Sequence, residues 1–219
     1  MTAVCVSGYG EGYSEGHPFK RLCNSLKADQ PSLKEYSLPN AGAPRLRECT
    51  DFFGSLLRSG GITELYLHSL AVNVFRHAAQ NLPPECVADL QRTLKAIFLV
   101  APGVGQMVAE DYFPELAEFY SGQRNADSDW RGVLNLSHHK PCMVVSPDDP
   151  YLESHEVYEM KSIDGADGES AFHWINAPLG THHFCQHSDL ALVATVIESI
   201  REIRKVLLGS NLGGDRGSN

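Results

Sequence analysis

Residues 63–71 read TELYLHSLA, and they combine a short buried strand with the beginning of a helix. Thr63 to Leu67 has the length and apolar content of a strand in the interior of a sheet. Helical spacing follows from Leu70 to about Asn81, so His68 and Ser69 occupy the turn between the two elements. Ligands of open parallel sheets bind beyond the carboxyl ends of the strands, which makes a serine at such an end a candidate reactive residue.

The same alternation of strand and helix runs through most of the 219 residues. Short apolar runs predict six strands, at Ala3–Ser7, Lys34–Leu38, Thr63–Leu67, Lys95–Ala101, Pro141–Ser146 and Ala171–Asn176. Helical spacing is found at His17–Ala28, Ala43–Arg58, Leu70–Asn81, Glu85–Leu94, Ser154–Ser162 and Ser188–Leu208. This alternation is typical of a mostly parallel sheet with helices on both faces, so we expect a three-layer α/β fold.

No linker divides the sequence, so we expect residues 1–208 to form a single domain. The glycine-rich, polar residues 209–219 are expected to be a disordered tail. Residues 103–140 depart from the alternation, because they contain no predicted strand but carry several aromatic residues, namely Tyr112, Phe113, Phe119, Tyr120 and Trp130. Such a long excursion is commonly a lid or binding loop, although simple packing accounts for aromatic residues equally well.

Composition argues against several classes of function. The formal net charge is -9 and there is no basic stripe, so neither a nucleic acid nor an anionic membrane surface is expected as a partner. No apolar stretch is long enough to span a bilayer, and the first residues do not resemble a signal peptide. The six cysteines are scattered without a C-x-x-C pair, which favours reduced thiols in a cytoplasmic protein. We expect a cytoplasmic monomer or homodimer that acts on a small molecule.

Three predicted strand ends carry side chains that could form a catalytic triad. Ser69 follows the third strand, Asp148 and Asp149 follow the fifth, and His182 and His183 come shortly after the sixth. The chain order Ser…Asp…His is that of α/β-hydrolases and differs from the orders in chymotrypsin and subtilisin. Each residue also has an ordinary alternative role, as a helix N-cap, a turn residue before a proline, or a loop histidine.

These residue types suit acyl transfer. A histidine takes the proton of the serine hydroxyl, and a carboxylate orients the histidine and stabilises the imidazolium that forms. Backbone N–H groups then bind the developing oxyanion. We expect these donors to be the N–H of Leu70, at the start of the helix, and the N–H of Tyr9, in the loop after the first strand.

Four motifs together resemble a known family. They are SGYGEG after the first strand, LHSLA around Ser69, VVSPDDPYL after the fifth strand and THHF before the last helix. They are similar to motifs of the small serine hydrolases related to retinoblastoma-binding protein 9, a compact branch of the α/β-hydrolases, over about residues 2–208. The resemblance implies an α/β-hydrolase-like fold and selects Asp149 as the triad acid and His183 as the base. It also implies hydrolysis of modest esters, amides or peptides without a metal or cofactor. Because no charged side-chain pocket is evident, we expect an ester or thioester as the acyl substrate.

Three positions depart from the family pattern. The usual elbow is G-x-S-x-G, but this chain has Leu67 and Ala71 in place of the two glycines. A branched side chain at position 67 is expected to strain the turn. The usual glycine before the triad histidine is replaced by His182. These departures leave open a second hypothesis, a catalytically inactive hydrolase fold that binds a ligand or a protein partner.

Two other kinds of site are less favoured. His182, His183, Cys185 and His187 include zinc-ligating residue types, but their spacing matches no standard metal site. The run Gly8-Tyr9-Gly10-Glu11-Gly12 is similar to a dinucleotide-binding loop, but its third fingerprint position is Tyr13. Glu11 would also repel a pyrophosphate, so we expect no bound nucleotide.

Overall fold

In a computed structural model, the chain forms a parallel sheet enclosed by helices. The structure describes residues 2–10, 13–103, 116–120, 126–152, 154–163, 169–185 and 187–209. The strands are β1 (Thr2–Ser7), β2 (Lys34–Ser37), β3 (Ile62–Ser69), β4 (Ala96–Pro102), β5 (Cys142–Val145) and β6 (His173–Asn176). They lie in the order β2-β1-β3-β4-β5-β6, and all neighbours are parallel, which confirms the predicted sheet.

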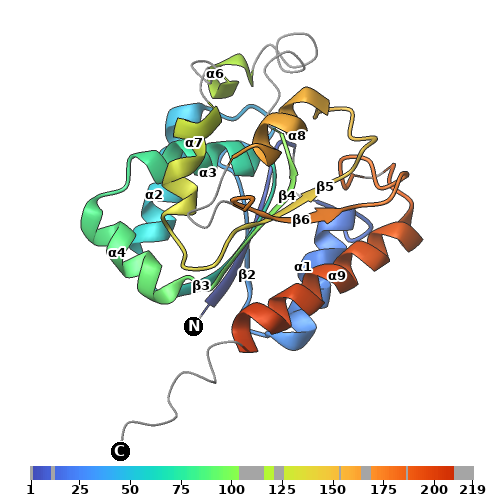
Figure 1. The fold of residues 1–219 in the computed structure, drawn as a ribbon, viewed down its shortest axis with the longest axis horizontal. Helices are drawn as coiled ribbons and strands as arrows, with labels where there is room; N and C mark the ends of the chain where they lie inside the picture. The colour runs from blue at the N-terminus through green and yellow to red at the C-terminus, as the bar shows by residue number, and fades with distance from the viewer. Residues whose placement is uncertain are drawn as a thin grey trace, which may run out of the picture.

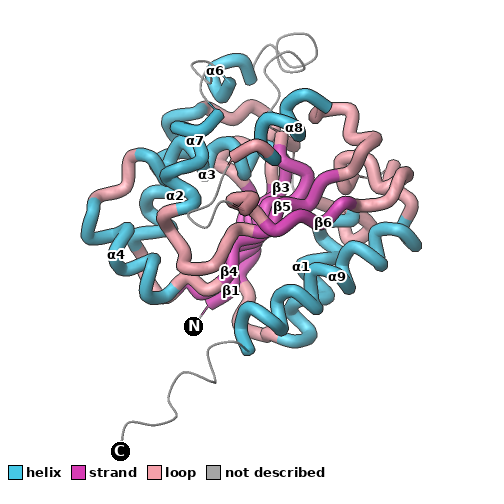
Figure 2. Tube along the Cα trace, viewed as in Figure 1, coloured by secondary structure: helices cyan, strands magenta, loops and turns pink. Residues whose placement is uncertain are grey.

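Helices cover both faces of this sheet (Figure 1). Their bounds are α1 (Pro18–Asp29), α2 (Leu46–Arg58), α3 (Leu70–Gln80), α4 (Pro84–Thr93), α6 (Ala117–Tyr120), α7 (Ala126–Leu134), α8 (Ser154–Lys161) and α9 (Leu190–Gly209). Figure 2 shows α1 and α9 on one side of the strands and α2, α3, α4 and α7 on the other. The three-layer arrangement predicted from the alternation is therefore confirmed.

Alternate residues of the central strands supply two separate cores. Leu65 and Leu67 of β3 point into the core beneath α2 and α3. Tyr66 points into the core beneath α1 and α9, where it stacks on Phe98 with the ring centroids 4.9 Å apart. Successive side chains of a strand point to opposite faces, so a central strand covered on both sides is apolar along its whole length.

Element boundaries differ from the sequence prediction by up to three residues, and two of these differences have a clear physical cause. The helix expected from Ala43 begins at Leu46 instead, because Pro44 disfavours helical backbone at the residue before it. The strand expected to end at Leu67 continues to Ser69, because His68 pairs with Val100 of β4. The second difference places Ser69 at the end of the strand, with no intervening loop before α3.

The predicted insertion at residues 103–140 is described only in part. Phe119 and Trp130 are fully buried in the core beneath α3, and Phe172 meets the Trp130 ring edge-on at 5.2 Å. These two aromatic side chains are therefore packing residues, whereas Tyr112 and Phe113 lie outside the described residues. A lid over the site stays a prediction.

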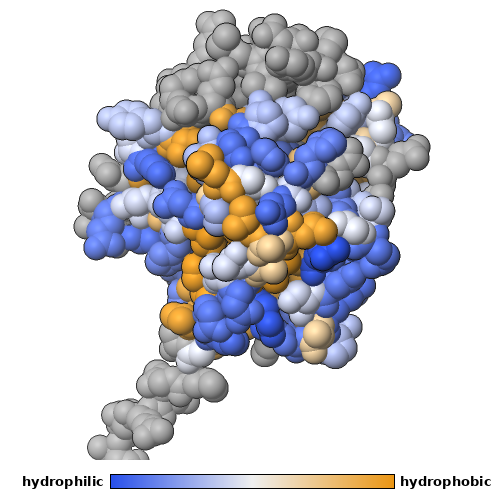
Figure 3. All heavy atoms as spheres, turned by 90° about the vertical axis from the view of Figure 1, so that its right-hand side faces the viewer, coloured by the Kyte–Doolittle hydropathy of each residue, from blue (hydrophilic) through white to orange (hydrophobic). Residues whose placement is uncertain are grey.

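On the face seen in Figure 3, polar residues surround apolar residues that gather near the centre. The large apolar side chains that are exposed among the described residues are Tyr158, Leu179, Leu190 and Val206. Within the part of the chain that the structure describes, no helix is both long enough and apolar enough to cross a membrane.

Candidate active site

The backbone turns sharply at Ser69, between β3 and α3. Its φ is 56° and its ψ is -128°, a combination that residues with a side chain rarely adopt. The register between β3 and β4 shifts between His68 and Ser69, so the regular strand pattern ends there. Strain of this kind is characteristic of a nucleophile held at a strand-to-helix turn.

The structure brings together the three side chains predicted as a triad. Nε2 of His183 lies 2.7 Å from Oγ of Ser69, and Nδ1 of His183 lies 2.9 and 2.8 Å from the two carboxylate oxygens of Asp149. A carboxylate can only accept here, so Nδ1 carries the proton and Nε2 accepts the hydrogen bond of the Ser69 hydroxyl. This is the tautomer that a general base needs.

Burial keeps the acid–base pair away from water. The Asp149 side chain is 0% exposed and the His183 side chain is 6% exposed. The backbone N–H of Tyr151 donates to Oδ1 of Asp149 at 2.9 Å, and the Tyr151 ring meets the His183 ring edge-on at 4.8 Å. Tyr151 was not singled out from the sequence, although it directly follows the D-D-P segment.

Asp148 does not contact His183 but supports the loop that carries it. Its carboxylate accepts the N–H of Gly180 at 2.6 Å and the N–H of His182 at 3.1 Å, and also the hydroxyl of Ser146. Partial desolvation acts to raise the pKa of Asp148, but these hydrogen bonds and the nearby His182 ring outweigh it and lower that pKa. Asp148 is therefore ionised, and its carboxylate holds the loop that carries His183.

His182 occupies a backbone conformation that favours glycine, with φ at 45°. The family that the sequence resembles has glycine at this position, and the backbone here does adopt a conformation that suits glycine. The Nδ1 of His182 lies 3.0 Å from the Asp148 carboxylate, so the side chain that replaces glycine contacts the residue that supports this loop.

Leu67 does not block the turn as the sequence suggested. It pairs with Val6 on one side and Leu99 on the other, and its side chain is fully buried in the core beneath α2 and α3. It is absent from the described residues that have positive φ, so its position has no need for glycine. The expectation that a leucine at position 67 would distort the elbow is therefore wrong.

The glycine that the elbow does require is Gly8, in the loop after β1. A Cβ on Gly8 would lie 2.7 Å from the His68 carbonyl oxygen, 2.9 Å from the Leu70 nitrogen and 2.9 Å from the Ser69 Cβ. The loop after β1 therefore passes directly against the nucleophile turn. The sequence signal is the glycine that immediately follows β1 in SGYG, which the sequence analysis considered only as part of a glycine-rich loop.

This close approach bears on the predicted oxyanion donors. Leu70 is the first residue of α3, where backbone N–H groups have no partner within the helix. Gly8 packs closely against the Leu70 nitrogen, and Tyr9 is the next residue along the chain. The pairing of the Tyr9 and Leu70 N–H groups around an oxyanion stays a prediction.

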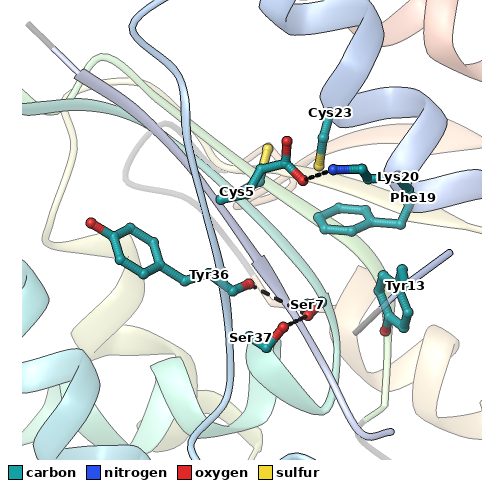
Figure 4. A pocket seen from close by; sticks show the side chains of 9 residues that line it. Cys5, Ser7, Tyr13, Phe19, Lys20, Cys23, Tyr36 and Ser37 are labelled. Carbon is teal, nitrogen blue, oxygen red and sulfur yellow. Dashed lines mark hydrogen bonds and ion pairs between the residues drawn. The ribbon is translucent and has the colours of Figure 1, made fainter. Parts of the chain in front are cut away.

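A separate cavity of about 230 Å³ lies beside β1, β2 and α1 (Figure 4). Its lining contains no triad residue and consists of Cys5, Ser7, Tyr13, Phe19, Lys20, Cys23, Glu35, Tyr36 and Ser37. In its lining, Lys20 pairs with Glu35 at 2.7 Å and Ser7 with Ser37 at 3.1 Å. The cavity is separate from the triad, although Tyr13 and Phe19 of its lining also contact the His68 ring next to Ser69.

No group of three or more His, Cys, Asp or Glu side chains that could hold a metal ion exists among the residues with described positions. In particular, His182 and His183 bind different aspartates rather than converging on one point. The loop proposed as a possible dinucleotide site includes residues 11 and 12, which lie outside the described residues.

Known proteins resemble this chain in fold. Neither a protein-family model nor a curated protein sequence matches it. Among solved structures, the ydeN gene product from B. subtilis is similar with a TM-score of 0.60 and 19% identity, over 92% of this chain and 98% of that one. A structure from the study of LipS and LipT, two metagenome-derived lipolytic enzymes, has a TM-score of 0.59 and 11% identity, over 93% and 94% of the two chains. The monoacylglycerol lipase of Paleococcus ferrophilus has a TM-score of 0.55 and 10% identity, over 92% and 94%.

These similarities extend over nearly the whole of both chains in each pair. The chain therefore has the α/β-hydrolase fold, as the sequence predicted. These three structures do not link the chain to the group of retinoblastoma-binding protein 9, so that narrower resemblance stays a prediction.

Proposed function

We propose that this chain is a serine hydrolase that cleaves small esters or thioesters through an acyl-enzyme intermediate. The observation that carries the proposal is the continuous hydrogen-bonded series from Ser69 Oγ through His183 to Asp149, with distances of 2.7 and 2.8 Å. A nucleophile, a base in the required tautomer and a buried carboxylate are the triad that acyl transfer by a serine hydrolase uses.

The geometry supports a specific path for each proton. Ser69 Oγ forms a bond to the substrate carbonyl carbon while its proton moves to Nε2 of His183, and the carbonyl oxygen becomes an oxyanion. The bond to the leaving alcohol or thiol then breaks, and His183 returns the proton to it. A water molecule repeats the sequence on the acyl-enzyme, releasing the acid and restoring Ser69. The Asp149 carboxylate stabilises the imidazolium in both halves.

The proposed oxyanion donors are the Tyr9 and Leu70 N–H groups. Such donors act on charge that exists only in the transition state, and the loss of one costs about 3–4 kcal/mol of transition-state stabilisation. The close packing of Gly8 on the elbow supports this assignment, because it sets the loop after β1 beside the start of α3.

Names of structurally similar proteins support the substrate class. They include lipolytic enzymes, a monoacylglycerol lipase and a thioesterase domain from the curacin biosynthetic pathway, the last with a TM-score of 0.50 and 10% identity. All the proposed steps use residues of this chain alone, so we propose that it acts without a metal or cofactor. Cytoplasmic location and a monomeric or homodimeric state stay predictions.

Labelling with a fluorophosphonate tests the proposal directly. We expect the probe to modify Ser69, as located by mass spectrometry of peptides, and Ser69→Ala to abolish both labelling and the hydrolysis of short p-nitrophenyl esters and acyl thioesters. Ser59→Ala is a suitable control, because Ser59 is an exposed residue directly after α2 whose hydroxyl donates to the Leu56 carbonyl. A folded protein that neither reacts with the probe nor hydrolyses either substrate would favour the inactive, ligand-binding alternative.

A further inference from the structure

The residue before the proposed nucleophile, His68, has a buried side chain that the triad does not use. It is only 2% exposed, yet both of its ring nitrogens have polar partners. Nε2 lies 3.0 Å from the backbone carbonyl oxygen of His183, and Nδ1 lies 2.6 Å from the hydroxyl of Tyr13. The ring thus connects the nucleophile strand to the loop of the base.

These partners determine which nitrogen of His68 carries the proton. A carbonyl oxygen cannot donate, so Nε2 is the protonated nitrogen and donates to His183. Nδ1 is then an acceptor and receives the hydrogen bond of the Tyr13 hydroxyl. The Tyr13 oxygen in turn accepts the backbone N–H of Gly8 at 3.1 Å. Donors and acceptors match at every step from Gly8 to the His183 carbonyl.

Aromatic packing holds this series in place. The ring of Phe19 stacks on His68 with the centroids 5.0 Å apart, and the ring of His17 stacks on Tyr13 at 3.7 Å. Burial, followed by the charges of His183 and His17, lowers the pKa of His68 well below its usual value. The His68 ring therefore stays neutral and keeps one fixed tautomer.

We infer that His68 and Tyr13 are positioning residues that hold the proposed base and the loop after β1 in register with Ser69. The inference rests on the proposed function, because it concerns how that site is kept in its reactive geometry. The three connected segments would supply the oxyanion donor, the nucleophile and the base. Catalytic groups need placement to within about half an ångström, and a displacement of about 1 Å in such a site can cost 100-fold in rate.

Two amide substitutions at position 68 separate this role from simple packing. His68→Gln places its amide nitrogen at the level of Nε2, where it can still donate to the His183 carbonyl. His68→Asn places its amide at the level of Nδ1, where it can meet Tyr13 but cannot reach that carbonyl. We expect His68→Asn to lower kcat for a p-nitrophenyl ester about 10- to 100-fold with little change in KM, and His68→Gln to retain most of the activity.

Tyr13→Phe is the third variant, since it removes one oxygen and keeps the ring that stacks on His17. We expect an intermediate loss of kcat and a matching loss in the rate of fluorophosphonate labelling.

The folded wild-type protein supplies a measurement that needs no variant. Long-range proton–nitrogen NMR should show His68 as the Nε2–H tautomer, unchanged from pH 8 to pH 6.

The outcomes are distinct. If wild-type protein shows no Ser69-dependent turnover, the proposed function fails and this inference fails with it. If wild-type protein is active but His68→Asn and Tyr13→Phe match it in kcat, or if NMR shows the Nδ1–H tautomer, only the positioning role is overturned. Equal losses of kcat in His68→Gln and His68→Asn would also overturn it, because the hydrogen bond to the His183 carbonyl would then make no difference to activity.

Discussion

Asp148 and Asp149 are adjacent in the chain, but their carboxylates bind different histidines. Asp149 lies 2.8 Å from Nδ1 of His183, whereas Asp148 lies 3.0 Å from Nδ1 of His182 and accepts two backbone N–H groups of the same loop. One carboxylate therefore orients the proposed base, and its neighbour holds the loop from which that base projects.

This division of roles predicts different defects in two matched variants. Asp149→Asn should lower kcat by about 10⁴-fold, because an amide no longer stabilises the imidazolium and favours the wrong tautomer. Asp148→Asn should retain far more activity and should instead reduce the free energy of unfolding by about 1–3 kcal/mol, through the loss of charge-assisted hydrogen bonds. Ester kinetics and urea denaturation of both variants provide the comparison. Similar kcat losses in the two would contradict the separation.

The sequence predicted which strand ends meet at the site but not how the two aspartates divide their roles. Any parallel sheet with Ser69, the aspartates and the histidines at its carboxyl edge would bring these side chains near one another. Choosing between adjacent residues such as Asp148 and Asp149 depends on φ and ψ in the connecting loops. That choice came from a resemblance to a family, not from the physics of the residues.

Contacts between segments remote in sequence were also beyond prediction. The approach of Gly8 to the elbow depends on where the loop after β1 runs in space, and a lone sequence shows only that a glycine follows a strand. The tolerance of Leu67 was misjudged for a related reason. The sequence analysis assumed that the backbone at position 67 requires glycine. In the structure, the side chain at this position points into a core that has room for leucine.

The approach of Gly8 predicts a large effect from adding a single methyl group. Gly8→Ala would bring a carbon within 2.7 Å of a backbone oxygen, and backbone atoms have no rotamer by which to move aside. We expect the free energy of unfolding to fall by about 1–3 kcal/mol and the rate of Ser69 labelling to fall with it. Gly16→Ala is the matched control, because a Cβ there meets nothing within 4 Å and should change neither quantity. A fully stable and active Gly8→Ala protein would disprove the close packing.

Restoring the family glycine at position 67 should harm the protein. Leu67→Gly would remove a fully buried side chain from the core, which for leucine to alanine costs about 2–5 kcal/mol, with about 0.5–1 kcal/mol more for glycine in a strand. We expect a clearly lower midpoint in urea and no gain in kcat. Leu190→Gly, at a position 40% exposed, should cost much less. A rise in activity on Leu67→Gly would mean that the leucine does strain the elbow.

The buried neutral ring of His68 predicts a loss of stability on mild acidification. Desolvation, then the charges of His183 and His17, lower the pKa of His68 in the folded protein, while the unfolded chain titrates near pH 6.5. Below about pH 6.5 the unfolded state binds a proton that the folded state excludes, so stability is complete above this pH and declines as the pH falls. One such group contributes up to about 1.4 kcal/mol per pH unit. Burial also lowers the pKa of His17 to about 4, so His17 adds a decline of the same sign.

His68→Gln isolates this contribution, because the variant keeps His17, His183 and every carboxylate. We expect the free energy of unfolding, measured with urea at pH 7.5, 6.5, 5.5 and 5.0, to fall less steeply with pH in His68→Gln than in the wild-type protein. Both proteins should share the remaining decline that other groups cause. Parallel curves for the two proteins would show that His68 takes up a proton in the folded state as readily as in the unfolded chain. That result would contradict a neutral His68 ring whose Nδ1 accepts from Tyr13 and whose Nε2 donates to the His183 carbonyl.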